Sequence, residues 1–556
     1  MSSRSFDQRR PGHLEPRGRS VVISCWAAVV LLSLGSWAGC IVDRPLHVAL
    51  KDDVDRPPRS VVVFFVDGMD RARFRQLLAE GALPHIDQRF VRGGVRVEDA
   101  VSSLPSVTYP NCSSLLTGRF PGHHDILGNF WFDRATLEAY DYVALATYLD
   151  VNRHLRAATL YDLLRDRFTV NIQLQPHCGA VHTIDNRNVF AWLWIFGWYV
   201  EVDRNVGLCL EEVAQAANRV KRWPTVIATY YPGVDEIGHR FGPDSPEYGS
   251  ALGNIDRVVG RVCDALDATG LGGSTYYALI TDHSMSPIGR TTRIDLLRWL
   301  RQARGLRLLS GPLTQASYTH RYALLQNYDA VGAVDAGRVL LLHLRGQRGW
   351  SFRPDPQEVD QWVMAEPALP LLPAIGCVMM RDGPDRIRVR VRNQSAIVER
   401  RIEGGTARYR IAAEGNDLFG YRAMPPLAAF ADVGWHTSRQ WLEATIGTAY
   451  PDFVPQVVEM FDSPRTGDIV LMAAQGWSFV THEQGGHGSC LARDMLVPMF
   501  FAGPDLPQGG TIPLARFVDV MPTVLGLLGE QHRLDQIAPI DGVNLADELR
   551  QARPAH

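Results

Sequence analysis

Three aspartates and three histidines in this chain could hold metal ions. In chain order they are Asp67, Asp235, His239, Asp282, His283 and His487. Carboxylate oxygen and imidazole nitrogen are donors that zinc and similar borderline metals take from proteins. Six such ligands suffice for two ions, and a pair of ions can polarise a substrate, activate a nucleophile and hold a leaving oxygen. These residue types therefore predict a two-metal catalytic site.

A threonine beside a predicted helix start is the candidate nucleophile. Pro110 biases Tyr109 away from helical geometry, and Asn111 is a good N-cap for a short helix over 112–116. Thr108 would then lie just outside a helix N-terminus, where free N–H groups and the helix dipole favour an anion such as phosphate. A hydroxyl held by a metal ion loses its proton more easily and becomes a nucleophile.

Three apolar segments, 60–66, 225–231 and 276–281, have the continuous β-branched and aromatic character of strands buried on both faces. Each is followed directly or within a few residues by one of the three aspartates. Ligand sites in open parallel sheets form beyond the carboxyl ends of the strands. The spacing therefore predicts that the three acids meet at one edge of a sheet.

Helices are expected over 70–80 and from 245 to about 269, which gives the alternation of strand and helix typical of α/β proteins. We predict a mostly parallel central sheet flanked by helices, with a large α+β cap insertion. The predicted division is a signal or anchor segment, a tether, the first part of a catalytic domain, the cap insertion and the second part of the catalytic domain, at 1–44, 45–59, 60–289, 290–465 and 466–556.

The last part is expected to resume the first pattern. A strand is predicted at 468–473, a glycine-rich loop at 485–489, another strand at 496–502 and a final helix over 514–528. Within the insertion, the alternating residues of 386–393 predict one arm of a hairpin.

The N-terminal residues predict export. Residues 1–20 carry five arginines, and 21–42 contain no charge, which is the pattern of an export signal or an N-terminal anchor. The sequence Trp37-Ala38-Gly39-Cys40 resembles a bacterial lipoprotein box, although Trp37 departs from the usual leucine-like residue. We expect a location on the periplasmic side of the cell envelope, with membrane attachment by a lipid on Cys40 or by an uncleaved anchor. A soluble secreted form is the third alternative.

Composition and residue spacing limit the other binding partners and cross-links that we expect. The net charge of −3 gives no case for binding a nucleic-acid polymer. The cysteines beyond Cys40 are scattered without metal-binding spacing, and an oxidising compartment would allow one or two disulfides without indicating which cysteines pair. The uncharged segment 189–200 contains three tryptophans. It is either packed in a core or lid, or exposed to lipid.

Several short motifs together carry a family resemblance. They are Phe65-Val66-Asp67-Gly68, Thr108-Tyr109-Pro110-Asn111, Leu116-Thr117-Gly118, Asp235-Glu236-Ile237-Gly238-His239, Thr281-Asp282-His283 and Gly486-His487-Gly488. This set resembles the alkaline phosphatase superfamily, specifically its type I phosphodiesterase/nucleotide pyrophosphatase branch.

The resemblance implies a role for each residue. Asp67, Thr108, Asp282 and His283 would hold one Zn²⁺, and Asp235, His239 and His487 would hold the other. Thr108 would form a covalent phosphothreonine that water then hydrolyses. Asn111 would donate a hydrogen bond to a phosphoryl oxygen in the transition state.

The expected function is therefore that of an exported metal-dependent phosphodiesterase, which hydrolyses phosphate diesters or nucleotide pyrophosphates. Its substrate would be a small-molecule or lipid phosphate ester. One alternative is a phosphomonoesterase, or a phosphotransferase of phosphoethanolamine or phosphoglycerol type, acting on envelope lipids or glycans. The other is a catalytically silent envelope binding protein that keeps the fold.

Overall fold

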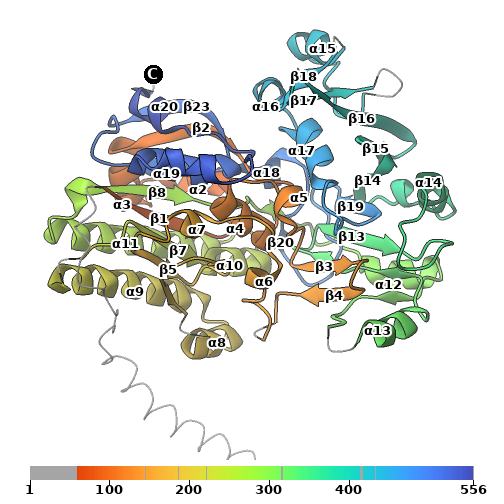
Figure 1. Cartoon of the computed structure of the whole chain (residues 1–556), viewed down its shortest axis with the longest axis horizontal. Coiled ribbons are helices and arrows are strands. Elements are labelled where there is room, and N and C mark those ends of the chain that lie inside the picture. The colour runs from red at the N-terminus through yellow and green to blue at the C-terminus, as the bar shows by residue number, and fades with distance from the viewer. Residues whose placement is uncertain are drawn as a thin grey trace, which may run out of the picture. The chain divides into compact units, whose positions relative to one another are not determined.

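The computed structural model describes residues 59–554 except 145, 186, 221, 315–316, 413–416 and 433. Figure 1 shows two large sheets in this part of the chain, each with its own helices. The predicted signal segment and the proposed lipid site at Cys40 lie outside the described residues. Across the described ranges, no helix combines the length and apolar character needed to cross a membrane.

The first sheet is built around β1 (Ser60–Val66), whose seven residues are all buried. It lies between β7 (Val226–Tyr231) and β8 (Thr275–Ile280) and is parallel to both. The full order is β24 (Arg553–Pro554), β23 (Gly510–Arg516), β2 (Val95–Val101), β22 (Met499–Ala502), β8, β1, β7, β5 (Thr169–Ile172) and β6 (His182–Ile184), with β21 (Leu496–Val497) beside β2. The predicted mostly parallel sheet is confirmed, with β22 as an antiparallel strand near its middle.

Helices cover both faces of this sheet (Figure 1). On one side α9 (Tyr199–Val220) packs on β7 and on α11 (Pro246–Ala268), with α10 (Gly233–Phe241) beside them. On the other side α19 (Val520–Leu528) packs on β1 and on α4 (Thr108–Thr117). The remaining helical elements of this part are α2 (Arg71–Ala79), α3 (Pro84–Ile86), η1 (Asp87–Arg92), α5 (Pro121–His124), α6 (Val151–His154), α7 (Leu160–Leu163), α8 (Arg187–Ile195), η2 (Gly272–Ser274), α18 (Ala492–Met495), η4 (Phe517–Asp519), η5 (Gln531–Gln536) and α20 (Ala546–Arg550).

The second sheet is mostly antiparallel and comes largely from the predicted insertion. Its order is β10 (Leu308–Leu309), β11 (Ala330–Val331), β13 (Val339–Leu344), β19 (Ile469–Ala473), β14 (Ile375–Gly383), β15 (Arg386–Val391), β16 (Gln394–Glu403), β17 (Thr406–Ile411) and β18 (His436–Thr437), with β12 (Val334–Asp335) beside β13. Its helices are α12 (Leu296–Ala303), α13 (Tyr318–Leu325), α14 (Pro356–Met364), η3 (Leu369–Leu371), α15 (Pro425–Asp432), α16 (Ser438–Thr445) and α17 (Phe453–Met460). The predicted hairpin is present as β15 and β16.

Two local predictions are wrong. The strand expected to resume the first sheet is β19, which lies between β13 and β14 in the second sheet. An apolar run such as Ile469–Ala473 is suited to burial in either sheet, so its pattern does not identify its neighbours. The final helix begins at Val520 rather than at 514, because Leu514–Arg516 complete β23 beside β2.

Two two-stranded antiparallel ladders complete the described strands. β3 (Phe130–Asp133) pairs with β4 (Glu138–Asp141), and the short β9 (Ser286–Pro287) pairs with β20 (Gly485–Gly486). The second ladder joins the segment after β8 to the glycine-rich loop after β19. It therefore brings residues from distant parts of the chain to the same edge of the first sheet.

Candidate metal centre

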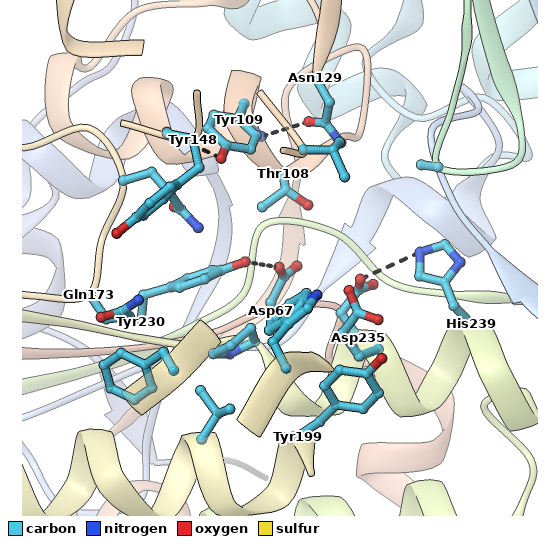
Figure 2. Close-up of a pocket in the computed structure, with 18 of the residues that line it drawn as sticks. Asp67, Thr108, Tyr109, Asn129, Tyr148, Gln173, Tyr199, Tyr230, Asp235 and His239 are labelled. Carbon is cyan, nitrogen blue, oxygen red and sulfur yellow. Dashed lines mark hydrogen bonds and ion pairs between the residues drawn. The ribbon is translucent and has the colours of Figure 1, made fainter. Parts of the chain in front are cut away.

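The ends of three adjacent strands position the acids. Asp67 directly follows β1, and its backbone N–H donates to the carbonyl of Tyr231 at the end of β7, 3.0 Å away. Asp282 comes two residues after β8, and Asp235 lies in the first turn of α10, just beyond β7. The parallel register places these ends side by side, as the sequence predicted. Figure 2 shows Asp67 and Asp235 directed toward the same space beneath Thr108.

A glycine permits the close approach of these elements. Gly68 has φ of +64°, a left-handed conformation that glycine adopts without steric cost. A Cβ at this position would lie 2.5 Å from Oδ1 of Asp235. Any larger residue after Asp67 would therefore displace Asp235, and the two acids could not share one site.

The first group of ligands is Asp67, Asp282 and His283, all buried. Nε2 of His283 lies 3.2 Å from Oδ1 of Asp67 and 3.3 Å from Oδ2 of Asp282. The other oxygen of Asp282 accepts hydrogen bonds from the backbone N–H groups of Gly68 and His283. One oxygen of Asp282 is thus bound to the backbone. Its other oxygen, Oδ1 of Asp67 and Nε2 of His283 lie close together around one point.

The second group is Asp235, His239 and His487. One turn of α10 separates Asp235 from His239, whose Nε2 is 3.4 Å from Oδ2 of Asp235. His487 comes from the loop after β20, and its Nε2 is 3.4 Å from Oδ1 of Asp235. The two groups are adjacent, because the rings of His283 and His487 are stacked with centroids 3.4 Å apart.

The three histidines share one orientation. Each has its Nδ1 within hydrogen-bond distance of a backbone carbonyl: Ser284 for His283, Gly485 for His239 and Ser106 for His487. A carbonyl only accepts, so each Nδ1 carries a proton and Nε2 is the ring nitrogen that faces the site. Nε2 of His239 and Nε2 of His487 face each other at 3.1 Å. With Nε2 deprotonated in both rings, the two nitrogens could bind one cation.

The carboxylates also indicate a site for cations. Oδ1 of Asp67, Oδ1 of Asp235 and Oδ2 of Asp282 are buried without a hydrogen-bond partner. Across the described residues, no arginine or lysine forms an ion pair with any of these three acids. Buried carboxylates without partners carry a large desolvation cost. Two divalent cations would satisfy these oxygens, so the residues present fit the predicted pair of metal ions.

Titration of the ligands reflects this crowding. Burial, together with the charge of Asp67, raises the pKa of Asp282 well above its usual value. Burial also raises the pKa of Asp235, against the opposing effect of His239. Although burial alone would lower them, nearby carboxylates raise the pKa of His239 to about 10 and of His283 to about 9. Burial and the charges of the other two histidines lower the pKa of His487 well below 6.5.

Thr108 lies at the position expected of a nucleophile. It is the first residue of α4, and its Oγ1 is 3.5 Å from Nε2 of His283. It lines a cavity of about 650 Å³, which it shares with Asp67, Asp235, His239 and His487. Four of the six predicted ligands and the predicted nucleophile therefore line one cavity.

The N-cap position predicted for Asn111 is wrong. The helix starts at Thr108 with Val107 as N-cap, so Asn111 lies within its first turn. The fully buried amide nitrogen of Asn111 donates to the carbonyls of Ser103, Pro105 and Val107, and its oxygen accepts from Ser102 and Ser103. Asn111 therefore shapes the loop before Thr108 and has no free donor for a substrate.

A different asparagine, Asn129, reaches the cavity. It lines the cavity beside Thr108, and its Oδ1 accepts from the backbone N–H of Tyr109 at 3.4 Å (Figure 2). This contact orients the amide so that its NH₂ group remains available as a donor. Only a turn-like Gly128-Asn129 before a strand marks this residue in the sequence, and such a pair is too common to indicate a site.

A third group, the His123 cluster, is close enough for a metal but has a different charge balance. It consists of His123, Glu459, Asp462, Asp541 and Arg400. His123 contacts the three acids at 2.7, 3.0 and 2.8 Å, and Arg400 pairs with two of them. Burial opposes the charge of His123, but these contacts raise its pKa to about 12. The acids are thus already paired with cations of the chain.

Comparison with known proteins agrees with this geometry. The family model described as type I phosphodiesterase / nucleotide pyrophosphatase matches residues 61–494. The chain belongs to this family. It is 27% identical over 253 residues to an uncharacterized pyrophosphatase/phosphodiesterase of Schizosaccharomyces pombe, covering 43% of this chain and 47% of that protein. It is 25% identical over 258 residues to a human bis(5'-adenosyl)-triphosphatase, covering 43% of this chain and 50% of that protein.

The aligned region therefore spans about half the length of these curated relatives. Solved structures extend the likeness of the fold. Murine ectonucleotide pyrophosphatase / phosphodiesterase 5 superposes with a TM-score of 0.52 at 15% identity, covering 89% of this chain and 99% of that one. Its human counterpart gives 0.51 at 15% identity, covering 88% and 99%. The phosphodiesterase family and the predicted α/β fold are thus confirmed.

Further cavity residues of this family member were not recognised in the sequence. The hydroxyl of Tyr230 donates to Oδ2 of Asp67, and Glu483 lies 3.6 Å from Nδ1 of His239. Glu236 lines the cavity between Asp235 and His239, and burial with the charge of Asp235 raises its pKa to about 7. Tyr230 lies in a predicted strand and Glu236 in a predicted ligand motif. Neither pattern shows that the side chain faces the cavity.

The aromatic segment 189–200 is partly packed against the cavity and partly exposed. Phe190 and Trp194 line the cavity, whereas Trp192, Ile195, Phe196 and Trp198 are exposed by 44 to 63%. Phe196 stacks between Trp192 and Trp198. One face of α8 therefore forms a wall of the cavity, and the residues of the other face and of the following turn form an exposed aromatic surface next to it.

Proposed function

We propose that this chain is a two-zinc hydrolase of phosphodiesters or nucleotide pyrophosphates that uses Thr108 as its nucleophile. The observation that supports this most strongly is the convergence of two Asp/His groups, with unpartnered carboxylate oxygens, on the cavity that contains Thr108. Nitrogen and oxygen donors in groups of three are typical of catalytic zinc, which keeps a further position open.

The side chains divide the reaction among them. Thr108 Oγ1 forms a bond to phosphorus while the bond to the leaving ester oxygen breaks, and this yields a phosphothreonine. Water then attacks the same phosphorus and restores the hydroxyl. The amide of Asn129 and the N–H groups in the first turn of α4 donate to phosphoryl oxygens as their charge grows. Bound cations would ease loss of the threonine proton and stabilise the charge on the leaving oxygen.

The cavity favours a diester over a monoester. Its volume of about 650 Å³ lies in the range of pockets that enclose a drug-sized ligand, much larger than a phosphate group alone. Tyr148, Gln173 and Phe190 line it away from the ligand groups, so a second ester arm has space and partners. A nucleotide arm is one candidate, in line with the name of the human relative, a bis(5'-adenosyl)-triphosphatase.

The test compares three esters with purified full-length protein and added zinc. Bis(p-nitrophenyl) phosphate and a nucleoside 5'-p-nitrophenyl phosphate should be turned over well above p-nitrophenyl phosphate. Thr108→Ala should lower turnover by about 10³-fold or more while keeping most of the bound zinc, since six other ligands remain. Turnover of Thr108→Ala within tenfold of the parent would exclude Thr108 as the nucleophile.

The exposed aromatic surface supports a second candidate substrate, a phosphodiester with an apolar arm such as a lipid headgroup ester. Trp192, Phe196 and Trp198 adjoin the cavity wall and could cover a hydrocarbon chain that leaves the cavity. With p-nitrophenyl diesters that carry a methyl or a hexadecyl second arm, Trp192→Ser/Phe196→Ser should lower kcat/KM for the long arm only. Phe352→Ser, at an exposed aromatic outside the cavity lining, is the matched control. Equal loss for both arms would exclude this surface as an arm site.

We also propose that the protein is exported and held at the cell envelope through its N-terminal segment, on the basis of the arginines in 1–20 and the uncharged run 21–42. Mass spectrometry of the N-terminal peptide from membranes tests this. A diacylglyceryl group on Cys40 supports lipid attachment, an intact segment supports the anchor, and a cleaved unmodified peptide in the soluble fraction supports secretion.

A further inference from the structure

Two buried cysteines from distant parts of the chain lie in contact. Cys377 is in β14 of the second sheet, and Cys490 follows the loop that carries His487. Their sulfur atoms are 3.8 Å apart, and each residue is only 3% exposed. A disulfide needs the sulfurs about 1.8 Å closer, at about 2.05 Å.

We propose that Cys377 and Cys490 are joined by a disulfide bond in the folded protein. The bond forms by thiol–disulfide exchange with a small-molecule or protein disulfide. Each thiol loses a proton, one S–S bond forms between the cysteines, and the oxidant takes up two electrons and leaves as two thiols. This inference is independent of the proposed phosphodiesterase activity, because it depends only on the packing of β14 against the loop.

The position of the bond gives it a role. Cys490 is three residues from the candidate ligand His487. The loop between them is held at its other contacts by polar groups: Ser489 bonds Asp494, which pairs with the buried Arg338, and the Ser489 carbonyl accepts from Ser106. Cys377 pairs with Met472 of β19 in the middle of the second sheet. A disulfide would therefore add a covalent link between that sheet and the loop that completes the second ligand group.

The surroundings indicate when the bond forms. The neighbouring sulfur and burial raise the pKa of the Cys490 thiol well above its usual value. Since the thiolate is the reactive form, exchange in the folded protein is slow. The pair is therefore oxidised while the chain folds, before the apolar cluster around Phe453, Val470 and Met472 closes over both sulfurs. Once formed, the bond is shielded from reductants in solution.

The experiment unfolds and refolds the full chain in a glutathione redox buffer, traps free thiols with iodoacetamide and maps peptides without reduction. We expect a peptide pair linked through Cys377 and Cys490, and two fewer titratable thiols than in the reduced chain. Cys377→Ser and Cys490→Ser should each abolish the linked pair. Cys178→Ser, at a partly exposed cysteine whose thiol contacts Asn152, should retain it.

A thermal readout adds a measurement that does not need the single variants. Refolding in excess reduced glutathione should lower the Tm of the parent but leave the Tm of Cys377→Val/Cys490→Ala unchanged. Absence of the linked peptide from parent refolded in oxidised glutathione would overturn the proposal, as would linkage of either cysteine to a different partner.

Discussion

Two groups of charged side chains in this protein look alike as lists of residues and differ in their charge balance. The candidate metal centre contains three aspartates and three histidines, and its carboxylates have no arginine or lysine partner among the described residues. The His123 cluster has three acids and one histidine, together with Arg400. Both groups connect segments far apart in the chain, so proximity alone does not separate a ligand site from an ion-pair network.

The difference lies in what each group still lacks. In the His123 cluster, a protonated histidine and an arginine compensate the acids. In the metal centre, three buried carboxylate oxygens have no hydrogen-bond partner, and Nε2 of His239 faces Nε2 of His487 at 3.1 Å. One unpartnered buried group is not sufficient evidence, since His343 is such a group and lies packed against Phe132. Several that converge on one point indicate a site that can hold a cation.

The largest expected effect comes from neutralising a ligand. Asp282→Asn should lower phosphodiester turnover by about 10³-fold or more and reduce bound zinc to about one ion per chain. In metal-free protein the same change should raise the free energy of unfolding by about 1–3 kcal/mol, because it removes a buried charge beside Asp67. Elemental analysis and urea unfolding with and without EDTA measure both. A metal-free variant less stable than the parent would mean that Asp282 is already compensated.

A comparison of two asparagines extends the test to uncharged donors. Asn129→Ala should lower kcat by about 10² to 10³-fold with little change in stability, because its NH₂ group has its partner in the substrate. Asn111→Ala should instead lower the free energy of unfolding by about 2–3 kcal/mol, because three carbonyls lose their donor. Steady-state kinetics and urea titration of both variants separate these effects. Equal loss of kcat without loss of stability in Asn111→Ala would return the catalytic role to Asn111.

The matched change in the His123 cluster should affect stability alone. Glu459→Gln leaves His123 and Arg400 short of one acid and should lower the free energy of unfolding by about 3 kcal/mol, with or without EDTA. Zinc content and turnover of the folded variant should equal those of the parent. A loss of bound metal in this variant would show that the cluster is itself a metal site.

The smallest expected effect is a pH dependence from His123. Its pKa is raised to about 12, so its pairing contributes stability fully below about pH 6.5 and loses that contribution as pH rises toward 12. His123→Gln should therefore be less stable than the parent by about 2 kcal/mol at pH 6, and by progressively less between pH 8 and 10. Urea unfolding at these three pH values tests this. A constant difference across the range would contradict the assigned charge.

The sequence predicted that the candidate ligands lie together, because they stand in local patterns. Asp67, Asp235 and Asp282 follow recognisable strands, and parallel pairing brings strand ends together whatever else the chain does. Asn129 and Glu483 had no such pattern, since their positions depend on how separate loops pack. The N-cap was misplaced at Asn111 because a helix start is uncertain by a few residues; the helix begins earlier, at Thr108, and the side chain of Asn111 bonds the preceding loop. The partners of β19 were likewise beyond what an apolar run can specify.

The pairing of β19 within the second sheet also sets an order of assembly. Asp67, Asp235, His239, Asp282 and His283 all precede that sheet in the chain, whereas His487 follows it. During synthesis, the chain can form the first ligand group while the second still has only two members. The glycine-rich loop that meets Asp235 follows β19, which lies between β13 and β14. A nascent chain that stops before His487 would lack one ligand of the second group. Binding of both metal ions would therefore report that both sheets have formed.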